Sequence, residues 1–97
     1  SQTPSVVWNK CLSFIKDNIQ PQAFKTWFEP IIPVKLTDDV LSIQVPSKFF
    51  YEWLEEHYVK ILRLALENPE TKFTLIHNNN YLCLRLQTNK KKEPDIQ

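Results

Sequence analysis

Few residues in this sequence have the types and spacing that catalysis requires. Glu52, Glu55 and Glu56 form one carboxylate cluster, at the spacing of the polar side of a helix. Solvated helix faces commonly carry such a cluster, so we interpret it as surface rather than as an acid–base pair. No serine, histidine and aspartate set has a local signature of nucleophilic catalysis. The sequence therefore predicts a protein that is not an enzyme.

Metal ligands and redox pairs are also missing as patterns. Cys11 and Cys83 lie far apart, and neither has a partner at metal-ligand spacing. His57 and His77 are separated as well, so no ligand set is completed and no metal or cofactor is predicted. Two cysteines are few for a secreted disulfide scaffold. They favour reduced thiols in a cytoplasmic protein, with a disulfide as the alternative.

The 97 residues include no glycine, which excludes several nucleotide-binding loops. A Walker A loop, a dinucleotide fingerprint and the usual nucleophile elbow all need a backbone free of Cβ. The net charge is +1, and residues 1–87 carry nine basic and nine acidic side chains. Such a neutral body is poorly suited to neutralise phosphates, so strong nucleic-acid binding is not expected.

The composition is that of one globular domain, with 42% hydrophobic and 24% charged residues. No apolar run reaches the length of a membrane helix, and SQTPSVVW lacks the pattern of a secretory signal. Because the sequence has no methionine, we expect Ser1 not to be a native start. The chain is interpreted as a fragment, such as the first domain of a longer protein.

Periodicity predicts alternating groups of helices and strands. Thr3 and Pro4 can begin a helix that breaks at Asn18 or Gln20, and Pro21 can begin a second helix that ends at Pro30. The later segments are two half-buried strands at 32–36 and 41–45, a long helix at 48–67, and strands at 72–77 and 81–86. Pro33 suggests an edge strand, and Asn78–Asn80 can turn the second hairpin.

These elements predict an α+β fold, a two-layer sandwich in the order α-α-β-β-α-β(-β). The predicted domain covers residues 4–87. Residues 88–97 (TNKKKEPDIQ) show no periodicity and are predicted to be a flexible tail or the beginning of an interdomain linker.

The first helix has more apolar surface than one small core requires. Its apolar side chains span about 160° at about 100° per residue, against about 100° for a surface helix. Val7, Trp8 and Phe14 form one edge of this span. Two interpretations stay open at this point: the edge packs beneath the sheet or the third helix, or it contacts a partner.

A second apolar surface is predicted at the beginning of the third helix. Phe49 points about 140° from the centre of the predicted buried face, which includes His57, and Trp53 lies at its margin. Exposed aromatic rings are good interface anchors; the alternative is a hydrophobic staple. Lys25 and Lys48, with Lys35, could make a thin basic patch for weak single-stranded nucleic-acid contact.

Two stretches together resemble a known family. WNKCLSFIKDNIQPQAFKTWFEPI (Trp8–Ile31) and LSIQVPSKFFYEWLEEHY (Leu41–Tyr58) closely resemble the N-terminal domain of the bacterial chromosomal replication initiator DnaA. The resemblance covers roughly residues 8–66. It implies a compact KH-like α+β domain, here without a Gly-x-x-Gly loop, that precedes an ATPase domain and a DNA-binding domain in the longer initiator.

The resemblance also implies partners. It implies weak self-association through the first helix at Val7 and Trp8, and contact with the replicative helicase and initiator regulators through Ala23 and Phe49. A glutamate often stands at the position of Ala23 in that family, and alanine has no charge with which to make a salt-bridged contact there. The alternatives are a weak single-stranded nucleic-acid-binding module and a free-standing initiator-like adaptor.

Overall fold

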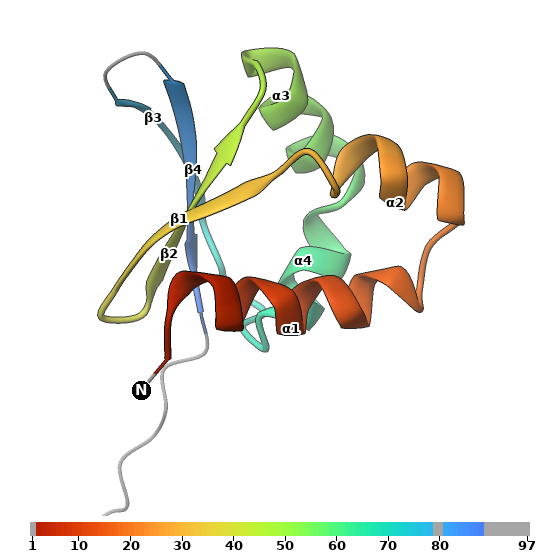
Figure 1. The fold of residues 1–97 in the computed structure, drawn as a ribbon, viewed down its shortest axis with the longest axis horizontal. Coiled ribbons are helices and arrows are strands. Elements are labelled where there is room, and N and C mark those ends of the chain that lie inside the picture. Colours follow the sequence, from red (N-terminus) through yellow and green to blue (C-terminus); the bar gives the residue numbers. More distant parts are fainter. Residues whose placement is uncertain (1, 79–80, 89–97) are drawn as a thin grey trace, which may run out of the picture.

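The computed structural model describes residues 2–78 and 81–88 of the chain (Figure 1). These residues form a small α+β domain with an antiparallel sheet, which confirms the predicted class. The elements in chain order are α1 (Pro4–Lys16), α2 (Pro21–Trp27), β1 (Ile32–Thr37), β2 (Val40–Val45), α3 (Lys48–His57), α4 (Val59–Ala65), β3 (Phe73–Asn78) and β4 (Tyr81–Gln87).

The four strands lie in the order β1-β2-β4-β3, and every neighbouring pair is antiparallel. The two hairpins were expected, but the pairing of β2 with β4 was not specified by the sequence. β1 is an edge strand, as Pro33 predicted, and its register shifts between Pro33 and Lys35. A proline is tolerated there because an edge strand can leave one N–H position unpaired. The half-buried alternation predicted for this strand is wrong, since Ile32 and Val34 are exposed.

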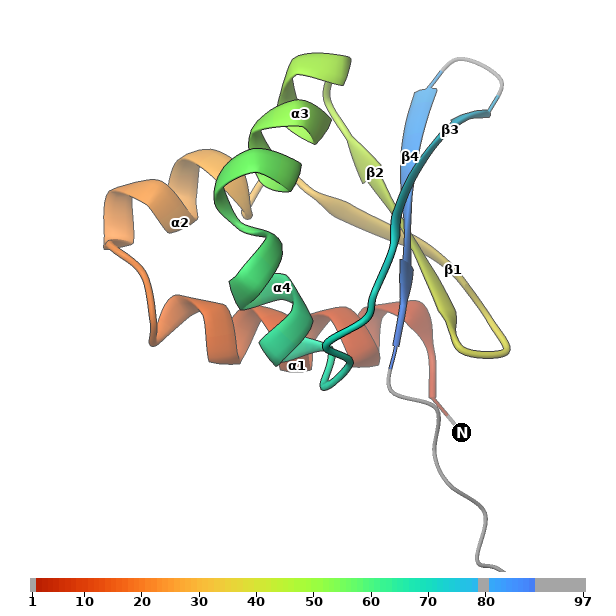
Figure 2. The same ribbon diagram turned by 180° about the vertical axis from the view of Figure 1, so that it is seen from behind.

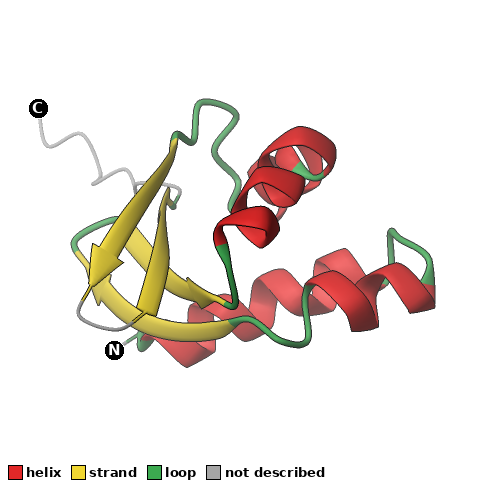
Figure 3. Cartoon of the chain, turned by 90° about the horizontal axis from the view of Figure 1, so that it is seen from above, coloured by secondary structure: helices red, strands yellow, loops and turns green. Residues whose placement is uncertain are grey.

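The helices form a second layer on one face of the sheet. Figure 3 shows the strands on one side of the domain and the helices on the other, and Figure 2 shows α4 beside α1. The chemical reason is the alternation within β2, where Leu41, Ile43 and Val45 point into the core and Ser42 and Gln44 point away. The result is a two-layer arrangement; its likeness to the KH fold stays a prediction.

The helix beginnings follow the capping residues of the sequence. The Thr3 hydroxyl accepts a hydrogen bond from the Val6 N–H at 3.2 Å, and the Ser47 hydroxyl accepts one from the Phe50 N–H at 3.3 Å. Pro4 and Pro21 stand at the first turns of α1 and α2. Each satisfied N–H removes one of the unpaired donors at a helix end.

The prediction of one long helix over 48–67 is wrong. The chain breaks at Tyr58, whose φ of −124° and ψ of 17° are not helical. The Tyr58 ring meets Phe28 edge-on at 5.2 Å, and α4 turns to pack against α1. No proline or glycine stands at the break. We therefore attribute the break to tertiary packing rather than to local helix propensity.

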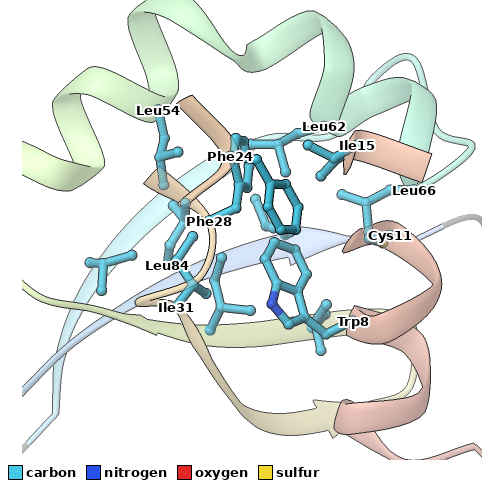
Figure 4. Close-up of a cluster of buried hydrophobic side chains, with 14 residues drawn as sticks. Trp8, Cys11, Ile15, Phe24, Phe28, Ile31, Leu54, Leu62, Leu66 and Leu84 are labelled. Carbon is cyan, nitrogen blue, oxygen red and sulfur yellow. The ribbon is translucent and has the colours of Figure 1, made fainter. Parts of the chain in front are cut away.

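The structure decides between the two interpretations of the α1 edge at Trp8. Only 1% of the surface of Trp8 is accessible, and Figure 4 shows its indole pointing from α1 into the core beside Phe24, Phe28 and Leu84. The wide apolar span of α1 is therefore largely used for folding, which was the first of the two interpretations. The indole N–H has no hydrogen-bond partner among the described residues.

Because the sequence has no glycine, other residue types adopt the left-handed region, and among the described residues these are Asp38 and Glu67. Asp38 has a φ of 56° in the turn between β1 and β2, and Glu67 has a φ of 58° after α4. The Asn68 N–H donates to the Arg63 carbonyl and the Glu67 N–H to the Leu64 carbonyl, which is a Schellman ending. Glycine normally occupies the position of Glu67, so this helix end carries backbone strain.

Two predictions fall on residues outside the described ranges. The asparagine turn involves residues 79–80, and the predicted tail or linker involves residues 89–97. Thr88 is described, and its N–H donates to the Asp39 carbonyl at 2.7 Å. The Thr88 carbonyl in turn accepts from the Asn68 amide at 3.3 Å, so this residue is tied to two neighbouring segments.

Candidate protein-interaction surface

Aromatic side chains of α2 and α3 gather at one end of the helical layer. We call Trp27, Phe49, Trp53 and His57 the aromatic patch. Trp27 and Trp53 stack in parallel with ring centroids 4.8 Å apart. Phe49 lies 6.0 Å from Trp27 and 5.9 Å from Trp53, and His57 lies 4.1 Å from Trp53. The patch is therefore a continuous assembly of rings contributed by two helices.

Local sequence explains why these rings meet. Residues 49, 53 and 57 follow one another at a spacing of four, so they form a single stripe along α3. Phe50 and Leu54 form the adjacent inward stripe, and Leu54 is completely buried. Pro21 begins α2, and Phe24 and Phe28 anchor that helix in the core. This anchoring brings Trp27 against the α3 stripe.

Phe49 is the exposed apolar ring of the aromatic patch. Its side chain is 58% accessible, which confirms the outward direction predicted from the helical period. Trp53 is half-buried, as predicted for the margin, and its indole N–H finds no hydrogen-bond partner among the described residues. His57 was placed on the buried face by the sequence, but it is exposed because the helix breaks at Tyr58.

Carboxylates border the aromatic patch. Glu52, Glu55 and Glu56 are exposed, in agreement with their interpretation as a solvated face. Glu56 approaches His57 at 3.8 Å. The Tyr51 hydroxyl donates to Glu55 at 3.1 Å, and desolvation first and this hydrogen bond second raise the pKa of Tyr51. The patch thus presents an apolar centre with an acidic border along α3.

The other predicted contact residues take different positions. Ala23 is half-buried one turn before Trp27 on α2, so it lies beside the aromatic patch but offers only a methyl group. Lys25 and Lys48 are exposed on α2 and at the beginning of α3. Lys35 lies on β1, on the sheet face away from the helices. The three lysines therefore do not form the single basic patch that was considered.

A second apolar surface lies on α1, although the buried Trp8 does not contribute to it. Val6 is 46% and Phe14 is 38% accessible, and Val7 is half-buried. Val7 also lines a cavity of about 350 Å³ between α1 and the end of α4. Sequence reasoning placed Val7 and Phe14 on one ridge correctly, but it could not separate them from the buried Trp8.

The two cysteine thiols lie away from solvent in the described part of the chain. Cys11 and Cys83 are buried free thiols. Burial, with a smaller effect of Glu67, raises the pKa of Cys11 to about 11, and burial raises the pKa of Cys83 while Arg85 opposes the rise. Residues 2–78 and 81–88 contain no group of metal-ligating side chains and no helix long and apolar enough to cross a membrane.

Comparison with known proteins gives a consistent result. The model of the DnaA N-terminal domain family matches residues 5–68. A chromosomal replication initiator protein DnaA from Flavobacterium psychrophilum is 73% identical over 86 residues, in a match that covers 84% of this chain and 18% of that protein.

Similar proteins of the same name come from two other bacteria. The Bacteroides fragilis protein is 52% identical over 60 residues, covering 62% of this chain and 13% of that protein. The Chlorobaculum tepidum protein is 49% identical over 69 residues, in a match that covers 68% of this chain and 14% of that protein. The chain thus spans less than a fifth of the length of these relatives. No solved structure matches it.

Proposed function

The chain belongs to the family of DnaA N-terminal domains, and on this premise we propose that it is the interaction domain of a replication initiator that acts in the cytoplasm. As a member of this family, it is a non-catalytic domain. In the proposal, its aromatic patch docks the replicative helicase or a regulator of initiation, and α1 contributes weak self-association.

The exposure of Phe49 within the aromatic patch is the observation that carries the proposal. A ring that is 58% accessible adds little to the core of its own domain. Trp27 and Trp53 both lie beside the Phe49 ring, with centroids 6.0 Å and 5.9 Å away, so this ring loses little rotamer freedom when a partner covers it. Such pre-ordered aromatic side chains favour binding because they bury a large area at low entropic cost.

Self-association is proposed to use Val7 and Phe14 on α1. Trp8 acts on this surface through the core, because its buried indole fixes α1 against the sheet. The exposed apolar area of α1 is small, so we propose weak association of isolated domains. Weak contacts become effective when several initiator copies are held close together, since the local concentration is then high.

Helicase binding can be tested with two alanine variants. Calorimetric titration of the helicase from the same organism should show a loss of affinity of at least tenfold for Phe49→Ala, in the range of an interface hot spot. Leu64→Ala on α4 is the matched control, because Leu64 is 65% exposed and lies outside the aromatic patch. Equal affinities of wild type and Phe49→Ala would contradict the proposal.

Self-association needs a separate measurement. Sedimentation at increasing protein concentration should show a rising mean mass for the wild type, and a smaller rise for the Val7→Ser/Phe14→Ser double variant. Thermal unfolding of the same samples establishes that the variant is folded. Identical sedimentation of both proteins would remove α1 from the proposal and leave the aromatic patch unaffected.

A further inference from the structure

The face of the sheet that points away from the helices carries polar side chains that border a hollow. Leu41 and Ile43 are completely buried in the core, so Ser42 between them points to the opposite face. In Figure 3 the helices lie on the other side of the strands. Side chains that share this outer face with Ser42 are therefore not used in packing the two layers together.

The strand register places a row of polar residues across this face. Lys35 of β1 is opposite Ser42 of β2, and Ser42 is opposite Arg85 of β4. Directly paired residues point to the same side of a sheet. A short serine between two long cationic side chains leaves a hollow of about 210 Å³, which is lined by Lys35, Thr37, Asp38, Val40, Ser42 and Arg85.

The charges in this hollow are not neutralised by ion pairs within the described ranges. There, the one ion pair joins His57 and Glu56, at a different place in the fold. Lys35 and Arg85 thus have no carboxylate within salt-bridge distance among these residues. Asp38 contributes one negative charge to the wall, so the hollow has two positive charges against one. The hydroxyls of Thr37 and Ser42 are additional donors.

We propose that this hollow, the outer-face site, binds a phosphate dianion, either inorganic phosphate or a phosphate monoester. A guanidinium group can donate two parallel hydrogen bonds to phosphate oxygens, an ammonium group adds a point charge, and a hydroxyl can donate to a further oxygen. Arg85, Lys35 and Ser42 provide these three donor types around one space.

The arrangement fits a phosphate dianion better than a carboxylate or a nucleic-acid backbone. A carboxylate has two oxygens and one charge, so it would leave part of this donor set unused. A nucleic-acid backbone requires a track of cations, whereas residues 1–87 are balanced in charge and the outer-face site has two cations. The proposal does not depend on the aromatic patch or on α1, which lie on the other side of the sheet.

Titration of the labelled protein with inorganic phosphate, followed by amide NMR, tests the outer-face site. Ionic strength and pH are held constant with sodium chloride and buffer. We expect saturable shifts at the amides of Ser42 and Arg85, and little change in α3. Lys35→Gln should weaken binding by about tenfold, the effect of losing one charge-assisted hydrogen bond, and Arg85→Gln should weaken it by at least as much, because two such bonds are lost.

Two further variants sharpen the result. Asp38→Asn should tighten binding several-fold because it removes a like charge, and asparagine tolerates the positive φ at this position. Lys72→Gln, which removes an exposed cation outside the hollow, should leave the affinity unchanged. O-phosphoserine in place of phosphate distinguishes a monoester from the free ion, and dimethyl phosphate should bind more weakly than either.

Shifts that fail to saturate would overturn the proposal, as would equal phosphate affinities of wild type and Arg85→Gln. Each variant is first compared with the wild type by its amide spectrum outside the outer-face site, and an unchanged spectrum shows that the fold is retained. Tighter binding of dimethyl phosphate than of phosphate would also contradict the proposal, because it would indicate recognition without the second charge.

Discussion

Replacement of Trp8 separates a core role from an interface role most clearly. The indole is 1% accessible and lies in the centre of the apolar cluster. Truncation of such a residue to alanine removes its buried area and leaves a cavity, at a cost of about 3–5 kcal/mol. A domain of this size is stable by about 5–15 kcal/mol in total. Trp8→Ala should therefore remove a large share of the folding free energy.

The effect is measurable as a melting temperature. At about 4–8 °C per kcal/mol for a domain of this length, we expect Trp8→Ala to melt on the order of 20 °C below the wild type. Circular dichroism during heating provides the measurement. Phe14→Ala is the control on the same helix, and its loss should be much smaller because Phe14 is 38% accessible.

A conservative variant tests the physical cause. Trp8→Phe loses part of the buried area, but it also removes an N–H that has no hydrogen-bond partner among the described residues. A buried unsatisfied donor costs about 1–3 kcal/mol, so the two effects should cancel to within about 1 kcal/mol. If the melting temperature of Trp8→Ala fell by less than about 5 °C relative to the wild type, the assignment of Trp8 to the core would be refuted. If Trp8→Ala also lost self-association, we would attribute that loss to unfolding of the domain and not to a direct contact of Trp8 with a second copy.

Further predictions concern strain, capping, exposure and ionisation. Glu67→Gly should stabilise the domain by about 0.5–1 kcal/mol in chemical denaturation, because glycine adopts the positive φ of 58° freely, whereas Glu70→Gly should destabilise it. Ser47→Ala should lower stability in the same assay by about 1 kcal/mol, since the Phe50 N–H loses its cap; an unchanged midpoint would contradict this role. Phe49→Ala should lower the melting temperature by only a few degrees, as expected from partial burial worth about 1 kcal/mol; a fall as large as that of Trp8→Ala would make it a core residue. Cys11 holds its proton more tightly when folded, because its pKa is about 11. The stability it contributes should be complete below about pH 9 and should decrease as pH rises to about 11, and this part of the slope should be absent in Cys11→Ala.

The aromatic patch illustrates how far local patterns carry. The outward direction of Phe49 follows from the helical period alone, because a regular helix fixes the angle between any two of its residues. The stacking of Trp27 on Trp53 could not be predicted, since it depends on how α2 docks against α3. The position of His57 was mispredicted for the same reason: the period was extended through Tyr58, where packing interrupts the helix.

Local chemistry in the sequence determined the caps at Thr3 and Ser47, the edge position of Pro33, the alternation within β2 and the α+β class. Each of these depends on residues a few positions apart. The tertiary structure alone decided that β2 pairs with β4, that Trp8 is enclosed in the core, and that Lys35 and Arg85 border one hollow. These depend on contacts between segments distant in the sequence. The periodicity of one helix predicts which side chains share a face, but it does not predict which neighbouring element covers that face.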